Sequence, residues 1–261
     1  MPLAIPPELE LKQVRALLAD IAPLGNFDRL RVLELGAGNG RLAWPFAAEA
    51  ELWVCLDVDE AELAKAARGR QQKGCPSLLL VAADARVLSF DAEAFDVAFF
   101  SWSLCCLDPA DMSVALCEAY RVLKPGGLLL DLHATEDALA LEVWRIGRSG
   151  NGRPGYEDVV HRVPVGCLDP ADTPHGFLEA TDALAALLES GDFALRHSTA
   201  FEYRYFFDSL DELRHHLRNQ HEHATLGRAL AERARAIIRQ APMRHKLVTL
   251  QRVAATALQK T

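Results

Sequence analysis

Hydrophobic residues in the first half of the chain gather in short continuous runs rather than in alternation with polar ones. Four runs lie at 31–35, 52–56, 78–83 and 95–101, and a fifth at 128–133 follows a Pro-Gly-Gly sequence. Continuous apolar strands are typical of parallel sheets that are covered on both faces. Together with right-handed crossovers, this pattern predicts an α/β protein with a doubly wound, mostly parallel sheet.

Helix-like stretches separate these runs, at 40–50, 60–71 and 111–123. An apolar stripe with helical spacing at 8–22 predicts a further helix ahead of the first strand. This alternation of strands and helices is what a doubly wound sheet requires.

The pattern is less regular after residue 134. Residues 148–158 are rich in glycine and polar side chains, which predicts an exposed loop. A helix is expected at 177–190, with Gly191 as its stop signal. The remaining expected elements are strands at 159–166, 193–207 and 246–256 and helices at 209–220 and 225–240.

The strongest local motif is VLELGAGNGRL at 32–42, where a strand is followed by three glycines and a helix start. Glycines let the backbone turn sharply and let a ligand lie against the main chain, and a helix start offers unpaired N–H groups. Dinucleotide sites share this arrangement but require the spacing G-x-G-x-x-G. Arg41 stands where that pattern has its last glycine, which disfavours a nicotinamide-dependent oxidoreductase.

Two carboxylates follow the glycine loop in chain order. Asp57 ends the second strand run, where an acid accepts hydrogen bonds from ribose hydroxyls. Asp84 ends the third run, where its carboxylate and the N–H of Ala85 could bind an adenine ring. Each acid alone could equally be a loop or helix-capping residue. Their order at successive strand ends favours a nucleoside site, because ligands of open α/β sheets bind along that edge.

These motifs together resemble those of the class I S-adenosylmethionine-dependent methyltransferases. The resemblance covers roughly residues 30–135 and rests on ELGAGNG, CLDVDEAEL at 55–63, AADARVLSF at 82–90, FDVAFFSWSLCCL at 95–107 and EAYRVLKPGGLLLDLH at 118–133. It implies a seven-stranded sheet with one antiparallel strand, which 193–207 and 246–256 could supply. It also implies S-adenosylmethionine as the cofactor.

By the same resemblance, the cofactor site falls on residues of the first four motifs. Glu34 occupies the acidic place of the first motif. The other expected cofactor-binding residues are Gly36, Ala37, Gly38 and Gly40 at the methionine moiety, Asp57 with Val58 at the ribose, Asp84 and Ala85 at the adenine, and Ser101 and Trp102 beside the sulfonium.

We expect four parts along the chain. Residues 1–29 form an N-terminal helical cap, and 30–133 form the core that binds S-adenosylmethionine. Residues 134–176 are an insertion that covers the substrate, and 177–261 are the C-terminal part of the sheet with inserted helices. Substrate identity in such folds resides mainly in the variable parts.

No catalytic residue is assigned, because a sulfonium methyl is already activated and a general base helps only when the nucleophile must lose a proton. His133 is the best-placed candidate base, although a histidine there is also an ordinary strand terminus. The four histidines of HHLRNQHEH lack cysteines or paired acids nearby, so a solvated helix end is favoured over a metal site. FEYRYFF at 201–207 is interpreted as a half-buried strand rather than a base-stacking strip.

Composition narrows the functional classes further. The 261 residues carry a net charge of −8, which disfavours nucleic acid as a partner but leaves a local basic patch open. Six cysteines without C-x₂-C spacing fit reduced thiols in the cytoplasm. No signal peptide and no membrane span are expected.

The sequence therefore predicts methyl transfer to a small-molecule acceptor of unknown identity, by a monomer or a homodimer. Two alternatives remain open. One is an RNA or protein methyltransferase, although Cys105 and Cys106 lack the preceding proline of cytosine C5 methyltransferases. The other is a non-catalytic protein that binds S-adenosylmethionine and acts as a scaffold or regulator.

Overall fold

The computed structural model describes residues 3–4, 27–73, 77–146, 159–170, 176–220, 224–240 and 244–261. These residues divide into two compact units. The larger unit falls within Leu11–Thr135, Gly176–Phe201 and Val253–Thr261, and the smaller unit within Met1–Glu10, Glu136–His175 and Glu202–Arg252. The helix expected at 8–22 and the loop expected at 148–158 lie outside the described residues.

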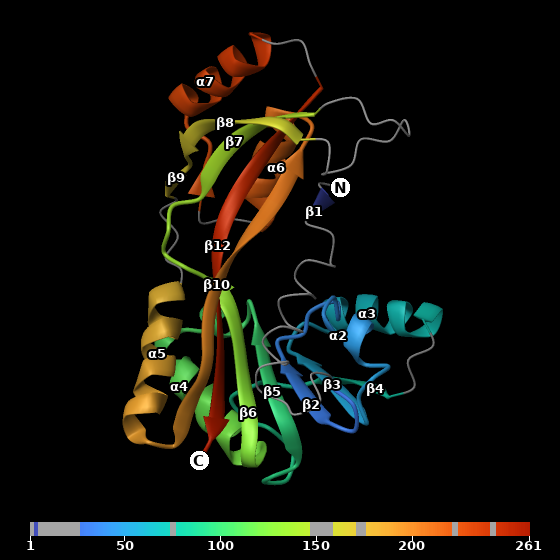
Figure 1. Ribbon diagram of the computed structural model, residues 1–261. Coiled ribbons are helices and arrows are strands. Elements are labelled where there is room, and N and C mark those ends of the chain that lie inside the picture. Colours follow the sequence, from blue (N-terminus) through green and yellow to red (C-terminus); the bar gives the residue numbers. More distant parts are fainter. Residues whose placement is uncertain are drawn as a thin grey trace. The chain divides into compact units, whose positions relative to one another are not determined.

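The larger unit contains the mostly parallel sheet that the apolar runs predict (Figure 1). Its parallel strands are β2 (Arg31–Leu35), β3 (Leu52–Asp57), β4 (Leu78–Ala82), β5 (Phe95–Ser101) and β6 (Leu123–Ala134). The strand order is β4-β3-β2-β5-β6, followed by β12 (His245–Lys260) and β10 (Phe193–Phe207). β12 pairs antiparallel with β6. The expected fold, a doubly wound sheet of seven strands with an antiparallel member, is confirmed.

Two helices cover one face of this sheet and build its main core. α4 (Pro109–Val122) and α5 (Phe177–Ser190) bury Ala115, Ala119, Ala180 and Leu184 against strand residues such as Phe100. Fully burying a large aliphatic or aromatic side chain contributes about 1.5–3 kcal/mol, so this apolar face determines which way the helices pack. The expected helix 177–190 is confirmed. It ends at Gly191, whose φ of 80° lies in the left-handed region.

The helix expected after the glycine loop is much shorter than the sequence pattern suggested. α2 covers only Ala43–Phe46, whereas 40–50 was expected. The glycine loop holds left-handed backbone as far as Gly40, with φ of 73°, so the helix begins after it. α3 (Glu60–Lys73) agrees with its expectation. β6 starts five residues before the expected 128, because Leu123 already pairs with Phe95 across an irregular register.

The smaller unit is built from antiparallel strands and two helices. β7 (Ala140–Ile146) pairs with β8 (Val159–Cys167) and with the first part of β12, while β1 (Leu3–Ala4) pairs with β10. β9 (Asp169–Pro170) pairs with β11 (Ala224–Thr225). α6 (Leu210–Gln220) and α7 (Arg228–Arg239) match the expected helices.

The smaller unit combines residues from the expected insertion and from the expected C-terminal part of the chain. Described residues of the expected insertion 134–176 share a hydrophobic core with α6, α7 and the first part of β12, in which Leu141, Val165, Leu213 and Leu247 are buried. β7 itself was not predicted. None of the helices in the described part of the chain is long and apolar enough to cross a membrane.

Candidate functional site

The glycine loop after β2 adopts the left-handed backbone that its composition predicts. Gly36, Gly38 and Gly40 have φ of 72°, 54° and 73°, values that L side chains rarely adopt. The N–H groups of Gly36 and Ala37 both donate to the carbonyl oxygen of Leu56, at 2.8 and 3.0 Å. The loop is therefore fixed to the end of the neighbouring strand β3.

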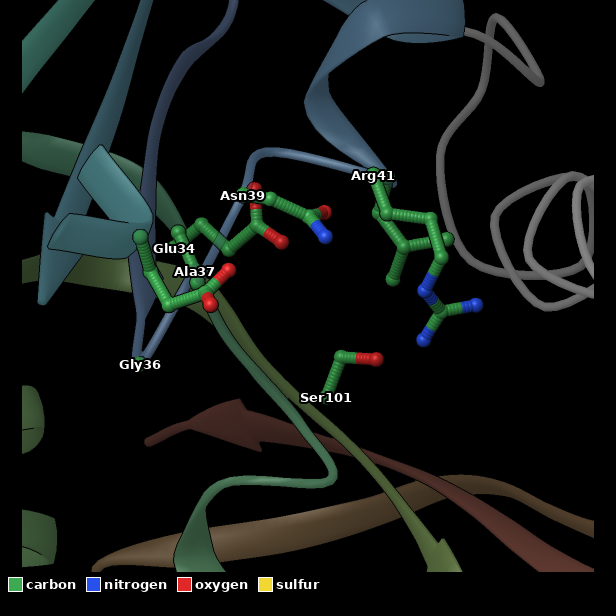
Figure 2. A pocket seen from close by; sticks show the side chains of 9 residues that line it. Glu34, Gly36, Ala37, Asn39, Arg41 and Ser101 are labelled. Carbon is green, nitrogen blue, oxygen red and sulfur yellow. The ribbon is translucent and has the colours of Figure 1, made fainter. Parts of the chain in front are cut away.

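A cavity of about 230 Å³ lies at this loop, within the larger unit. Figure 2 shows the side chain of Arg41 extending from the loop toward the side of the cavity where the hydroxyl of Ser101 lies. The lining residues are Glu34, Gly36, Ala37, Gly38, Asn39, Arg41, Leu42, Glu62 and Ser101.

Five of the residues expected to bind the cofactor thus meet at one cavity, namely Glu34, Gly36, Ala37, Gly38 and Ser101. The structure adds four lining residues that were not expected. Asn39, Arg41 and Leu42 continue the glycine loop, so their position in the motif could have indicated them. Glu62 lies on α3, and no sequence signal pointed to it.

Glu34 is a buried carboxylate on the wall of this cavity, only 2% exposed. Its Oε2 accepts hydrogen bonds from the indole Nε1 of Trp53 at 2.9 Å and from the Sγ of Cys55 at 3.6 Å. Burial, and then the neighbouring Glu34 carboxylate, raise the pKa of the Cys55 thiol. Because an isolated buried carboxylate is costly, these donors explain how β2 tolerates an acid at this position.

Asp57 connects the end of β3 to the glycine loop. Its Oδ2 accepts the backbone N–H of Gly38 at 2.6 Å, and its Oδ1 accepts that of Asp59 at 2.8 Å. An ionised carboxylate has about four lone-pair sites, so both oxygens keep capacity for a further donor. The next residue, Val58, is 71% exposed. Neither residue is among those lining the cavity.

Asp84 follows β4 and is engaged by a nearby arginine. The Nε of Arg86 lies 3.0 Å from both carboxylate oxygens, and Nη2 lies 2.6 Å from Oδ2. The pKa of Asp84 is held below its usual value, chiefly by the side-chain hydrogen bonds from Arg86. The other end of this guanidinium contacts Asp111. Asp84 and Ala85 are likewise not among the cavity-lining residues.

The last residue of β5, Ser101, lies at the glycine loop. The hydroxyl of Ser103 donates to the carbonyl oxygen of Leu35, at the end of β2. Between these serines, Trp102 has a φ of 59°, which is strained for a bulky side chain. The Oγ of Ser101 is buried, lines the cavity and has no hydrogen-bond partner among the described residues.

A buried hydroxyl without a partner costs about 1–3 kcal/mol, so such a group on a cavity wall suits a site that takes a polar ligand. The glycine backbone, the Glu34 carboxylate and the Ser101 hydroxyl therefore fit a ligand that carries both polar and charged groups.

His133 occupies a packed position in the larger unit and is 2% exposed. Its Nδ1 lies 2.5 Å from Oδ2 of Asp131, and its Nε2 lies 3.0 Å from the hydroxyl of Thr181 on α5. Both ring nitrogens thus lie within hydrogen-bond distance of a neighbouring side chain, one of Asp131 and the other of Thr181. This geometry supports the structural interpretation of His133 over a role as general base.

The other histidine and aromatic motifs have structural explanations as well. His216 is 2% exposed and packs against Tyr205 and Phe207, with ring centroids 4.7 and 5.1 Å apart. Phe201 to Phe207 lie in β10, as expected for a strand. His221 and His223 lie outside the described residues. Within the described ranges, no group of three metal-ligating side chains occurs.

Part of this chain is similar in sequence to known proteins. The family model described as "Methyltransferase domain" matches residues 32–127. The ubiquinone/menaquinone biosynthesis C-methyltransferase UbiE of Rhizobium meliloti is 34% identical over 131 residues, which is 48% of this chain and 49% of that protein. The chain therefore spans about half the length of the curated relatives it matches.

Solved structures share the fold at low sequence identity. The [4+2]-cyclase SpnF superimposes with a TM-score of 0.53 at 19% identity, covering 95% of this chain and 80% of that one. A Burkholderia thailandensis 1,6-didemethyltoxoflavin-N1-methyltransferase, solved with bound 1,6-didemethyltoxoflavin and S-adenosylhomocysteine, gives a TM-score of 0.51 at 19% identity, covering 97% of this chain and 79% of that one. Since a cyclase is among these neighbours, the fold by itself does not define the reaction.

The matched segment 32–127 contains the glycine loop, both strand-end acids and the turn with Ser101, on a sheet of order β4-β3-β2-β5-β6. That combination is typical of an α/β domain of the methyltransferase type. Residues 32–127 are therefore similar to the methyltransferase domains of class I enzymes, which use S-adenosylmethionine as the methyl donor.

Proposed function

We propose that this chain transfers the methyl group of S-adenosylmethionine to a small-molecule acceptor. The observation that carries the proposal is the cavity in which the glycine loop, Glu34 and Ser101 meet, inside the segment that matches the methyltransferase domain. Its buried acid provides a polar contact for the amino-acid end of the cofactor, and its unpartnered hydroxyl provides one for the reacting end.

In this proposal, each expected residue contacts one part of the cofactor. The glycine loop and Glu34 hold the methionine moiety, and Asp57 accepts hydrogen bonds from the ribose hydroxyls. Asp84 and Ala85 hold the adenine. Contact between Asp84 and the adenine amine requires Arg86 to release at least one carboxylate oxygen, because the guanidinium now donates to both.

The bound cofactor supplies an activated methyl group, so the protein needs only to align the acceptor and exclude water. The Ser101 hydroxyl lies on the cavity wall together with the loop and would hold a polar group at the reacting end. Trp102 would cover that end with its indole. Neither role requires proton abstraction by the chain, in agreement with the engaged state of His133.

The small-molecule class of the acceptor is supported by charge and by the relatives. A net charge of −8 gives no general attraction to RNA. The named relatives are C-methyltransferases of quinone biosynthesis, so carbon nucleophiles in phenols and quinols are the first acceptors to test. We place acceptor selection outside residues 32–127, in 1–29 and 134–176 among others, because the matched segment holds the shared cofactor motifs.

Two measurements test the proposal. Calorimetry should show that the protein binds S-adenosylmethionine and that Asp57→Ala binds it more weakly. Incubation with methyl-labelled S-adenosylmethionine and separate pools of phenolic metabolites, RNA and protein should place the label in the small-molecule pool. Label in RNA or protein would contradict the acceptor class. The absence of cofactor binding by the purified protein would contradict the whole proposal.

A further inference from the structure

The indole of Trp53 donates a hydrogen bond to the acid on the cavity wall. In the parallel register of β2 and β3, Glu34 stands opposite Cys55, and Trp53 lies two residues earlier on the same face of β3. The distance from Nε1 to Oε2 is 2.9 Å, and the exposed fractions of the two residues are 0% and 2%. This is a direct bond between fully buried groups.

The indole is held in this orientation by two phenylalanines. The ring of Phe27 meets it edge-on, with centroids 4.9 Å apart, and the ring of Phe46 stacks parallel to it at 6.0 Å. All three rings are fully buried. Side chains in a close-packed interior occupy single rotamers, so the N–H of Trp53 points in one fixed direction.

A fixed donor has two effects on the carboxylate it contacts. It holds the carboxylate in one rotamer, and it stabilises the ionised form, since hydrogen bonds to a charged acceptor are roughly twice as strong as neutral ones. Glu34 also lines the cavity, so its orientation decides whether negative charge faces a ligand there.

We infer that Trp53 is a positioning residue, whose indole N–H holds the Glu34 carboxylate toward the α-ammonium group of the cofactor's methionine end. The inference rests on the proposed function. It means that an indole in the apolar part of β3 determines how strongly the site selects a nucleoside bearing an amino-acid group over the bare nucleoside. The Cys55 thiol, a weak donor at 3.6 Å, contributes little to this effect.

Trp53→Phe tests the inference, because it keeps an aromatic ring and removes the donor. Dissociation constants are measured for S-adenosylmethionine and for 5′-methylthioadenosine, which lacks the amino-acid part. We expect about tenfold weaker binding of S-adenosylmethionine, the effect of losing one hydrogen bond to a charged group. The affinity for 5′-methylthioadenosine should not change.

Phe95→Leu is the control, since it disturbs another buried aromatic pair of the same unit, that of Phe95 with Phe90, without touching the indole or the two rings that hold it. It should lower the melting temperature while leaving the ratio of the two affinities at its wild-type value. A double-mutant cycle adds a second readout: in a Glu34→Gln background, Trp53→Phe should cause no further loss of S-adenosylmethionine affinity.

The inference is overturned if Trp53→Phe weakens both ligands equally or neither. Should that variant fail to fold, the indole N–H resonances of ¹⁵N-labelled wild-type protein test the inference instead. Phenylalanine at each other tryptophan in turn (Trp44, Trp102 and Trp144) assigns the remaining indole N–H resonance to Trp53. That resonance must shift with S-adenosylmethionine and not with 5′-methylthioadenosine. Wild-type protein that binds neither ligand would instead contradict the proposed function.

Discussion

Replacing Gly36 with alanine tests how closely the glycine loop fits the turn after β5. Gly36 has a φ of 72°, and a Cβ built on it would overlap the Cβ of Ser103. Neither partner can move independently, because Gly36 bonds to β3 through its N–H and Ser103 bonds to Leu35 through its hydroxyl. Gly36→Ala should therefore displace the loop or the turn.

The expected loss of unfolding free energy in Gly36→Ala has two parts. A left-handed backbone costs a non-glycine residue roughly 1–2 kcal/mol, and overpacking a well-packed site costs about 1–3 kcal/mol. Together they lower the free energy of unfolding by about 2–5 kcal/mol in Gly36→Ala. Gly191→Ala is the matched control, since φ there is 80° and a Cβ would meet nothing within 4 Å. It carries the backbone cost only.

Urea unfolding of the two variants and the wild type, followed by circular dichroism, measures this difference. Gly38→Ala is a second control for stability, with φ of 54° and no atom within 4 Å of the added Cβ. S-adenosylmethionine affinity should also fall in Gly36→Ala, because both Gly36 and Ser101 line the cavity. An unfolding free energy for Gly36→Ala within error of that for Gly191→Ala would refute the steric argument.

Three further outcomes follow from the same geometry. Asp57→Asn should weaken S-adenosylmethionine binding about tenfold by calorimetry, because the amide nitrogen replaces one of the two carboxylate oxygens that accept hydrogen bonds. An unchanged affinity would show that Asp57 is not part of the site. The Cys105 thiol lowers the pKa of Cys106 to about 7 by hydrogen bonding, so alkylation of Cys106 by iodoacetamide should accelerate as pH rises through that value. In Cys105→Ala, the rise in the alkylation rate should move up to the ordinary cysteine pKa of about 8.5. Identical pH profiles for the wild type and the variant would contradict the role given to the Cys105 thiol. His133→Phe should lower the unfolding free energy by about 3 kcal/mol in urea, since it leaves Asp131 buried without its partner. Lost methyl transfer with unchanged stability would instead make His133 a catalytic base.

The parallel part of the fold could be predicted from the sequence because its strands are buried on both faces. Each of the first four apolar runs agrees with an observed strand to within one residue at either end. Their doubly wound arrangement followed from the rule on crossovers. The start of β6 could not be predicted, because its pairing depends on an irregular register with Phe95.

The antiparallel part was harder to predict because its pattern is weaker and its partners are distant. β7 has the sequence ALEVWRI, in which Leu141 and Val143 are buried while Glu142 and Arg145 interrupt the apolar signal. The part of β12 that pairs with β7 begins at His245, so no sequence signal near β7 indicates this pairing. Strands of this kind are stabilised by cross-strand contacts rather than by an intrinsic preference.

The candidate site divides in the same way. Positions fixed by the backbone, such as the three glycines with left-handed φ, could be read from the motif. Contacts between side chains could not be predicted in this way. The hydrogen bond from Trp53 to Glu34 comes from a residue that the sequence pattern assigns to the core. The hydrogen bonds from Arg86 to Asp84 depend on the rotamers of both side chains.

This division explains why the sequence identifies the methyl donor and not the acceptor. In the proposed function, the donor is held by loops at adjacent ends of parallel strands, and a parallel sheet places those ends at one edge whatever the rest of the chain does. Acceptor selection, as proposed, depends on residues outside 32–127, and the described ones include antiparallel strands with distant partners. Variants of the glycine loop should therefore change affinity for S-adenosylmethionine with every acceptor alike. Variants in the smaller unit should change which acceptor is methylated while leaving cofactor affinity at its wild-type value.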